Sequence, residues 1–196
     1  MASAADPPAR FRDHSYWAKP VPGWGDASAK LWILGLAPAA HGGNRTGLTL
    51  QGDRSGDFLF DALIRHGLAT DRQTPKHCFL SNAVRCAPPD NKPSRDEFDR
   101  CGIWLDEEWK RLRNARVVLA FGKLAWDAGL RLAQRHGGKF DRKPAFAHGA
   151  KFAMPVGRTL VASYHVSQQN TFTGRLTPTG LDDVLEECVR IARASR

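Results

Sequence analysis

Four short apolar runs, separated by longer segments with helical periodicity, constrain the fold of this chain more than any other feature. The runs cover residues 31–36, 78–80 with 83–84, 117–122 and 160–164. Continuous apolar runs of this length are typical of strands buried on both faces of a parallel sheet. The remaining periodic segments predict helices over 56–66, 94–113, 123–135 and 178–194. This alternation predicts an open, mainly parallel sheet that helices cover on both faces.

The first 29 residues differ in composition from the rest of the chain. They are rich in proline, alanine and charged residues, and the segment 20–23 (Pro-Val-Pro-Gly) marks an extended lead-in. We therefore expect an N-terminal arm over residues 1–29 and a single domain over 30–196, which is long enough to bury a core.

The charge of the chain favours a polyanionic partner. The formal net charge is +9 and the sequence pI is about 9.8, so nucleic acid is the leading partner class, although many basic proteins bind nothing anionic. No apolar run approaches the roughly 20 residues that span a bilayer, and residues 1–12 hold no hydrophobic signal core. We expect a cytoplasmic protein that acts at the nucleoid, without membrane contact and as a monomer.

A glycine-rich polar segment follows the first apolar run. Residues 35–47 and 51–56 contain six glycines among His, Asn, Arg, Thr and Asp side chains. Because ligands bind beyond the carboxyl ends of parallel strands, this composition predicts a small pocket, with a flexible surface loop as the alternative. The glycine spacing matches neither a dinucleotide fingerprint nor a phosphate loop, so we expect no nucleotide cofactor.

A second polar segment follows the fourth run. His165 leaves the predicted strand and precedes a run of hydroxyl and amide side chains that Arg175 closes. Such groups can donate hydrogen bonds to a leaving group, contact phosphates and wedge into a base stack. For His165 alone, the alternative is a satisfied histidine at a capped helix start.

These two segments, together with residues 83–93 (Ala-Val-Arg-Cys-Ala-Pro-Pro-Asp-Asn-Lys-Pro), resemble the signature motifs of the family-five (type B) uracil-DNA glycosylases of the uracil-DNA glycosylase superfamily. The resemblance runs from about Phe11 to the last helix. It implies a three-layer α/β/α fold with a central four-stranded, mainly parallel sheet. It also implies a monofunctional enzyme of DNA base-excision repair, which hydrolyses the glycosidic bond of uracil and of other deaminated bases and leaves an abasic site.

The resemblance assigns the chemistry to two residues. His165 would donate a hydrogen bond to the carbonyl oxygen of the leaving base, and removing such a donor costs about 100- to 1000-fold in rate. Asp53 would orient or activate the water and offset the cationic sugar. A structural turn cap between Gly52 and Ser55 is the alternative for Asp53.

Binding roles are implied for two further groups of residues. The base-pocket candidates are Gly35, Ala37, His41, Asn44, Leu50 and Asn82. The DNA-binding candidates are Ser167, Gln168, Gln169, Asn170 and Arg175. Asn44 and Asn82 could read a base edge, since an amide offers an acceptor and two donors, while Gln168 with Gln169 would form the wedge. Leu50 stands where the family usually has an aromatic ring, which favours weaker or broader base selection.

The cysteines match the family pattern only in part. Relatives hold a 4Fe-4S cluster with four cysteines, and Cys86 and Cys101 match the second two. The first pair has no counterpart, because residues 1–77 contain no cysteine, and Cys78 and Cys188 are interpreted as small buried hydrophobes. Two thiolates do not hold such a cluster. Either a natural N-terminal segment is missing or the lineage has lost the cluster.

Two other functions compete with glycosidic hydrolysis. Leu50 and the missing cysteines are compatible with a catalytically weakened DNA lesion-binding protein of the same fold. His165 and Asp53 could also serve a small-molecule α/β hydrolase, whose activity would neither need DNA nor fall steeply with salt.

Overall fold

The computed structural model describes residues 7–194 and has a six-stranded sheet in the order β1-β5-β2-β6-β8-β7. The four central strands are parallel and lie where the apolar runs predict them: β2 (Leu31–Gly35), β5 (Cys78–Asn82), β6 (Val117–Phe121) and β8 (Thr159–Ser163). The predicted α/β fold with four central strands is therefore confirmed. Two short antiparallel edge strands, β1 (Trp24–Gly25) and β7 (Lys151–Ala153), extend the sheet beyond the prediction.

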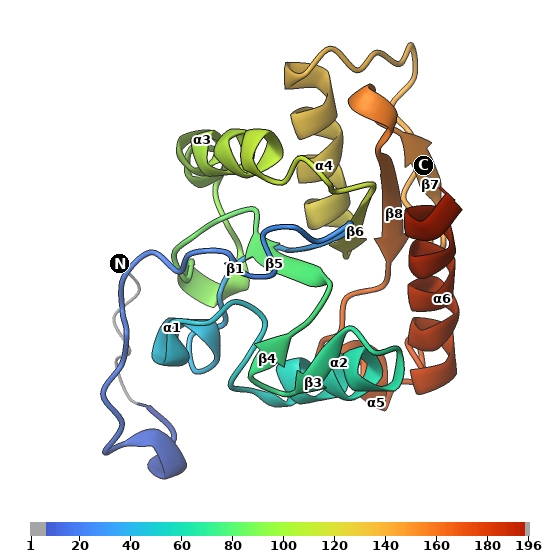
Figure 1. Cartoon of the computed structure of the whole chain (residues 1–196). Helices are drawn as coiled ribbons and strands as arrows, with labels where there is room; N and C mark the ends of the chain where they lie inside the picture. Colours follow the sequence, from blue (N-terminus) through green and yellow to red (C-terminus); the bar gives the residue numbers. More distant parts are fainter. Residues whose placement is uncertain (1–6, 195–196) are drawn as a thin grey trace.

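Four long helices cover the sheet in the two outer layers (Figure 1). Helices α2 (Arg54–Arg65) and α6 (Pro178–Ala194) pack on one face, and α3 (Arg95–Arg111) and α4 (Lys123–Arg135) pack on the other. All four lie within two residues of their predicted bounds. The start of α3 is fixed by a capping box, in which the Ser94 side chain accepts from the Glu97 amide and the Glu97 side chain accepts from the Ser94 amide.

Short elements complete the chain. They are η1 (Ala9–Phe11), α1 (Gly43–Thr46), β3 (Ala69–Asp71), β4 (Thr74–Pro75), η2 (Pro89–Asn91), η3 (Pro155–Gly157) and α5 (Gln168–Phe172).

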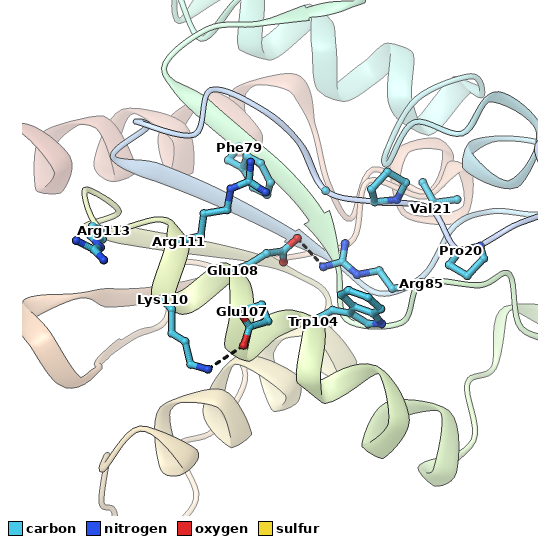
Figure 2. Close-up of a pocket in the computed structure, with 12 residues that line it drawn as sticks. Pro20, Val21, Phe79, Arg85, Trp104, Glu107, Glu108, Lys110, Arg111 and Arg113 are labelled. Carbon is cyan, nitrogen blue, oxygen red and sulfur yellow. Dashed lines mark hydrogen bonds and ion pairs between the residues drawn. The ribbon is translucent and has the colours of Figure 1, made fainter.

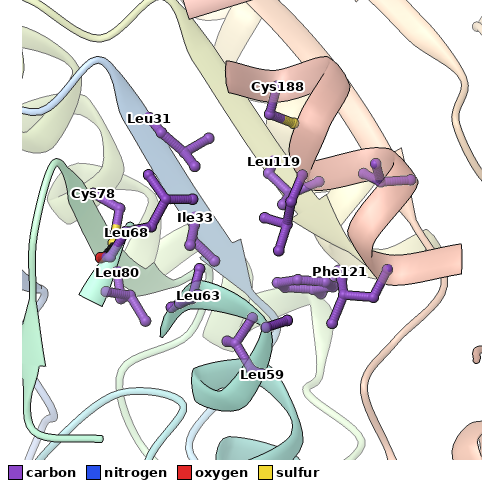
Figure 3. Close-up of a cluster of buried hydrophobic side chains, with 14 of the residues drawn as sticks. Leu31, Ile33, Leu59, Leu63, Leu68, Cys78, Leu80, Leu119, Phe121 and Cys188 are labelled. Atoms are coloured by element: carbon purple, nitrogen blue, oxygen red, sulfur yellow. Dashed lines mark hydrogen bonds between the residues drawn. The ribbon is translucent and has the colours of Figure 1, made fainter. Parts of the chain in front are cut away.

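Two hydrophobic cores lie on opposite faces of the sheet. Because side chains alternate along a strand, Leu31 and Ile33 point to the α2/α6 face while Trp32 and Leu34 point to the α3/α4 face. Figure 3 shows the first core, in which Leu59 and Leu63 of α2 meet the strand residues. Burial on both faces explains why the four central strands have continuous apolar sequences.

The described part of the N-terminal segment contacts the domain along its length. Val21 is fully buried, and Trp24 stacks on Phe60 and donates its indole N–H to the Thr49 carbonyl oxygen at 2.9 Å. Residues 1–6 of the predicted arm lie outside the described residues.

The parallel strands bring the three sequence motifs to one edge of the sheet. Gly35, Asn82, Phe121 and Ser163 end the four central strands at neighbouring register positions. The loops that follow β2, β5 and β8 therefore meet beyond this edge, where α/β proteins bind ligands. None of the helices within residues 7–194 is long and apolar enough to cross a membrane.

Candidate active site

A cavity of about 500 Å³ lies at this edge of the sheet, and all three motif loops contribute to it. Its lining residues are Leu36, Ala37, Ala39, Gly43, Leu50, Gln51, Asp53, Ser55, Gly56, Asn91, His165, Ser167, Gln168 and Gln169. The structure thus brings together seven of the candidate site residues predicted from the sequence: Ala37, Leu50, Asp53, His165, Ser167, Gln168 and Gln169. Their functional roles stay predictions.

The two carboxylate oxygens of Asp53 have different surroundings. It is the N-cap of α2, and its Oδ1 accepts a hydrogen bond from the Gly56 amide at 2.8 Å. Its Oδ2 lies against Gly42, where a Cβ atom, if the residue had one, would come within 2.6 Å of it. Asp53 therefore forms the cap that the alternative interpretation predicts. This cap uses only Oδ1 and leaves the second carboxylate oxygen for other interactions.

His165 enters the cavity directly after β8. Burial lowers the pKa of its imidazole below the ordinary value of 6.5, and the nearby Asp53 carboxylate opposes this shift. The side chain is therefore neutral at pH 7 and can donate one hydrogen bond. Gly122, at φ 86°, passes close to the ring, because a Cβ atom there would lie 3.7 Å from the His165 Cδ2.

Asn82 ends β5 and lies outside the cavity lining. Its side chain is fully buried, and among the described residues neither Nδ2 nor Oδ1 has a hydrogen-bond partner. Gly35 lies against it: a Cβ atom on Gly35 would clash with Asn82 Oδ1 and would lie 3.1 Å from Leu50 Cδ2. An unpaired buried amide of this kind costs about 1–3 kcal/mol per group, which a ligand with matching hydrogen bonds would recover.

Other candidates lie outside the cavity lining. His41 Nδ1 is 2.8 Å from the Tyr16 hydroxyl, and the buried Asn44 donates to the Ala40 carbonyl oxygen at 3.3 Å. The Arg175 guanidinium lies over the Tyr164 ring, 4.6 Å from its centroid. Asn170 also lies outside the lining, although its Nδ2 donates to the His165 carbonyl oxygen at 2.8 Å.

Several lining residues were not predicted as site residues. Leu36, Ala39, Gln51 and Ser55 fall inside the polar segments that predict the pocket, and this position is the signal in the sequence that could have identified them. Asn91 belongs to the motif 83–93 and reaches the cavity from η2, where it adopts φ 54°. A non-glycine residue in this left-handed region is uncommon, and asparagine is one of the residues that tolerate it.

A second and larger cavity, about 850 Å³, lies between the N-terminal segment and α3. Figure 2 shows Arg85 and Glu108 paired at its centre, with Trp104 beside them. Burial raises the pKa of the Glu108 carboxyl, and Arg85 opposes that shift. None of its lining residues is a candidate site residue.

The cysteines do not form a four-ligand site. The Arg85 amide donates to Cys101 Sγ at 3.4 Å, and the neighbouring Cys86 has a thiol pKa raised by burial and by Cys101. Cys78 and Cys188 are buried, as predicted, and they lie in the core on the α2/α6 face of the sheet; burial raises their pKa values to about 12. Within residues 7–194 no three metal-ligating side chains come together. A four-cysteine cluster therefore does not fit these residues.

The sequence of this chain matches a known protein family over the segments that form the site. The sequence profile of the Uracil DNA glycosylase superfamily matches residues 22–188, which include all three motif loops. The chain belongs to this superfamily. The resemblance stated from the sequence motifs is thereby confirmed.

Individual relatives within the superfamily narrow the membership to its type-5 group. A type-5 uracil-DNA glycosylase from Mycobacterium tuberculosis is 47% identical over 191 residues, which cover 93% of this chain and 70% of the relative. A type-5 uracil-DNA glycosylase from Thermus thermophilus is 44% identical, with 93% and 84% covered. A type-4 uracil-DNA glycosylase from Pyrobaculum aerophilum is more distant, at 31% identity with 78% and 74% covered.

Proposed function

We propose that this chain is a monofunctional uracil-DNA glycosylase that hydrolyses the N-glycosidic bond of uracil in DNA and leaves an abasic site. The observation that carries the proposal is that Asp53 and His165 line one cavity of about 500 Å³ at the edge where the family motifs meet. Membership of the superfamily supports it, as does the similarity to relatives that are named uracil-DNA glycosylases.

The reaction needs opposite charges to be stabilised at its two ends. Breaking the glycosidic bond places positive charge on the sugar and negative charge on the departing base. His165, neutral at pH 7, donates a hydrogen bond to the base oxygen, while the free oxygen of Asp53 faces the sugar and orients the attacking water. The water adds to the anomeric carbon as the base leaves, so the strand stays intact.

Base recognition falls to Asn82 in this proposal. The uracil edge offers a carbonyl acceptor next to an N–H donor, which is the complement of the amide group that Asn82 leaves unpaired. In this proposal Leu50, which lies beside the same Gly35 as the amide, shifts when a base reaches it. A leucine gives no ring for stacking, so we propose that the pocket also accepts other deaminated bases.

DNA binding and the cellular setting complete the proposal. The net charge of +9 attracts the duplex; Ser167 and Arg175 contact phosphates, and Gln168 with Gln169 lies at the point of extrusion. The protein acts as a monomer in the cytoplasm, without a nucleotide cofactor. No step uses an iron–sulfur cluster, because the described residues do not fit one.

The test is incubation with a labelled duplex that holds one uracil opposite guanine. We expect free uracil in the supernatant and strand breaks only after alkali, since no strand cleavage accompanies base release. Breaks without alkali would contradict the monofunctional assignment. Tight binding without base release, by protein that is folded, would replace the proposal with the lesion-binding function.

A further inference from the structure

The Arg45 side chain ties together two parts of the glycine-rich segment. Its Nε donates to the His41 carbonyl oxygen at 2.9 Å, and its Nη2 donates to the Gly52 carbonyl oxygen at 2.7 Å. Arg45 belongs to the short helix α1, and its planar guanidinium presents both donors in a fixed geometry. One side chain therefore links the main chain at His41 to the main chain at Gly52.

The two acceptor residues each precede a partner in the Asp53 contact. His41 is followed by Gly42, and Gly52 is followed by Asp53, whose Oδ2 would lie 2.6 Å from a Cβ atom on Gly42. Glycines at both places leave the main chain many accessible conformations, so the backbone alone fixes this approach poorly. The two hydrogen bonds of Arg45 link the segments directly beside the contact.

The N-terminal segment holds the Arg45 guanidinium in place. The Phe11 ring lies against it, with the guanidinium carbon 4.3 Å from the ring centroid, and Nη1 lies 3.3 Å from His14 Nδ1. The Trp17 amide donates to the Arg45 carbonyl oxygen at 3.1 Å. All three guanidinium nitrogens thus contact protein atoms, so this side chain is directed at its own loop and at the N-terminal segment.

We propose that Arg45 is a positioning residue for Asp53, because it holds the main chain before Asp53 against the His41 turn. This inference rests on the proposed function, in which the free oxygen of Asp53 orients the attacking water. A displacement of about 1 Å in a catalytic group can cost about 100-fold in rate. Arg45 lies outside the cavity lining and acts through the main chain.

Single-turnover release of uracil tests the proposal in a cycle with Asp53→Asn. We expect Arg45→Met to slow release by at least about 10-fold in the wild type and by less than about twofold in Asp53→Asn, where the positioned charge is already gone. Arg45→Lys keeps the positive charge but loses the two-donor fork, so it should also slow release, and it carries the test if Arg45→Met does not fold. Arg12→Met is the matched control, because it removes one positive charge from an exposed side chain of the N-terminal segment and should leave the rate unchanged.

The titration of His165 gives a readout that needs no turnover. The Asp53 carboxylate opposes the lowering of the His165 pKa by burial. In Arg45→Met the carboxylate is displaced, so this pKa should fall toward its value in Asp53→Asn, while Arg12→Met should leave it unchanged. NMR titration of the ring measures it.

The two readouts separate the positioning role from the proposed function. If the wild type releases no uracil but the pKa of His165 falls in Arg45→Met, the proposed function fails and the positioning role stands. Additive rate losses in the cycle, or a His165 pKa that Arg45→Met leaves unchanged, would overturn the role. So would a rate that saturating protein restores to the wild-type value, because Arg45 would then be a phosphate-binding residue.

Discussion

Asn170 donates a hydrogen bond from its side-chain Nδ2 to the main-chain carbonyl oxygen of His165, over 2.8 Å. The bond spans the turn between β8 and α5, so one amide fixes both His165 and the helix that contributes Gln168 and Gln169 to the cavity lining. The side chain itself lies outside the cavity lining. We therefore expect Asn170 to act as a positioning residue for His165.

Replacing Asn170 by alanine should slow single-turnover uracil release by about 10-fold, which corresponds to the loss of one hydrogen bond of about 1.4 kcal/mol. Thr173→Ala is the control, because Thr173 Oγ1, at the C-cap of the same helix, donates to the Gln169 and Asn170 carbonyl oxygens at 2.7 and 3.4 Å and forms no hydrogen bond with His165 among the described residues. The NMR shifts of the His165 ring should move in Asn170→Ala and not in Thr173→Ala. Equal effects of the two variants on rate and on those shifts would contradict the positioning role.

The titration of His165 gives a second prediction. Its pKa in the folded protein lies below 6.5 because of burial, so the folded state binds fewer protons than the unfolded state as the pH falls below 6.5. Stability that is present above pH 6.5 is therefore lost as the pH falls through the lower folded pKa. In Asp53→Asn the opposing carboxylate charge is gone, and the pKa of His165 should fall further. NMR titration of the His165 ring measures the pKa in the wild type and in Asp53→Asn. A pKa above 6.5 in the wild type would contradict the burial of this side chain.

Two substitutions of Asp53 distinguish its role in base release from its role as the N-cap of α2. Asp53→Asn keeps a side-chain oxygen for the Gly56 amide, so the free energy of unfolding should change little, while base release should slow by at least about 100-fold. Asp53→Ala should slow base release by a similar factor. It should also lower the free energy of unfolding by about 1 kcal/mol, because α2 loses its cap. Urea unfolding and single-turnover rates give the two quantities. A fully active Asp53→Asn variant would reduce Asp53 to a structural cap.

Gly42 tests the placement of the Asp53 carboxylate. A Cβ atom at Gly42 would lie 2.6 Å from Asp53 Oδ2, so Gly42→Ala should displace this oxygen and slow base release by at least about 10-fold in a folded protein. Gly102→Ala is the control, because a Cβ atom in this α3 position would be 3.7 Å from its nearest neighbour, Arg135. Normal activity of Gly42→Ala would mean that the carboxylate lies elsewhere during the reaction.

The sequence predicts the main layers of this fold because periodicity reports burial directly. The strand over 117–122 and the helix over 123–135 lie where the apolar pattern places them. The edge strands β1 and β7 escape prediction, since two or three partly exposed residues are too few to establish an alternation. Their pairing is set by the neighbouring strands β5 and β8.

The site is predicted less completely than the fold. Asp53 and His165 follow from motif resemblance, and the parallel topology explains why they meet. His41 and Asn44 lie in the same glycine-rich segment, yet His41 contacts Tyr16 and Asn44 contacts a main-chain carbonyl. The direction of a side chain in a loop depends on the local backbone and on distant contacts, and neither can be read from residue type and spacing.

The measurement that tests the central claim most directly is single-turnover release of uracil by His165→Ala beside the wild type. Both proteins are saturated with the same U·G duplex, and binding is measured separately on an uncleavable analogue. The account predicts a release rate lower by about 100- to 1000-fold with nearly unchanged binding, because the lost hydrogen bond acts on the departing base. An equal release rate in the two proteins would contradict the assignment of the chemistry to this cavity.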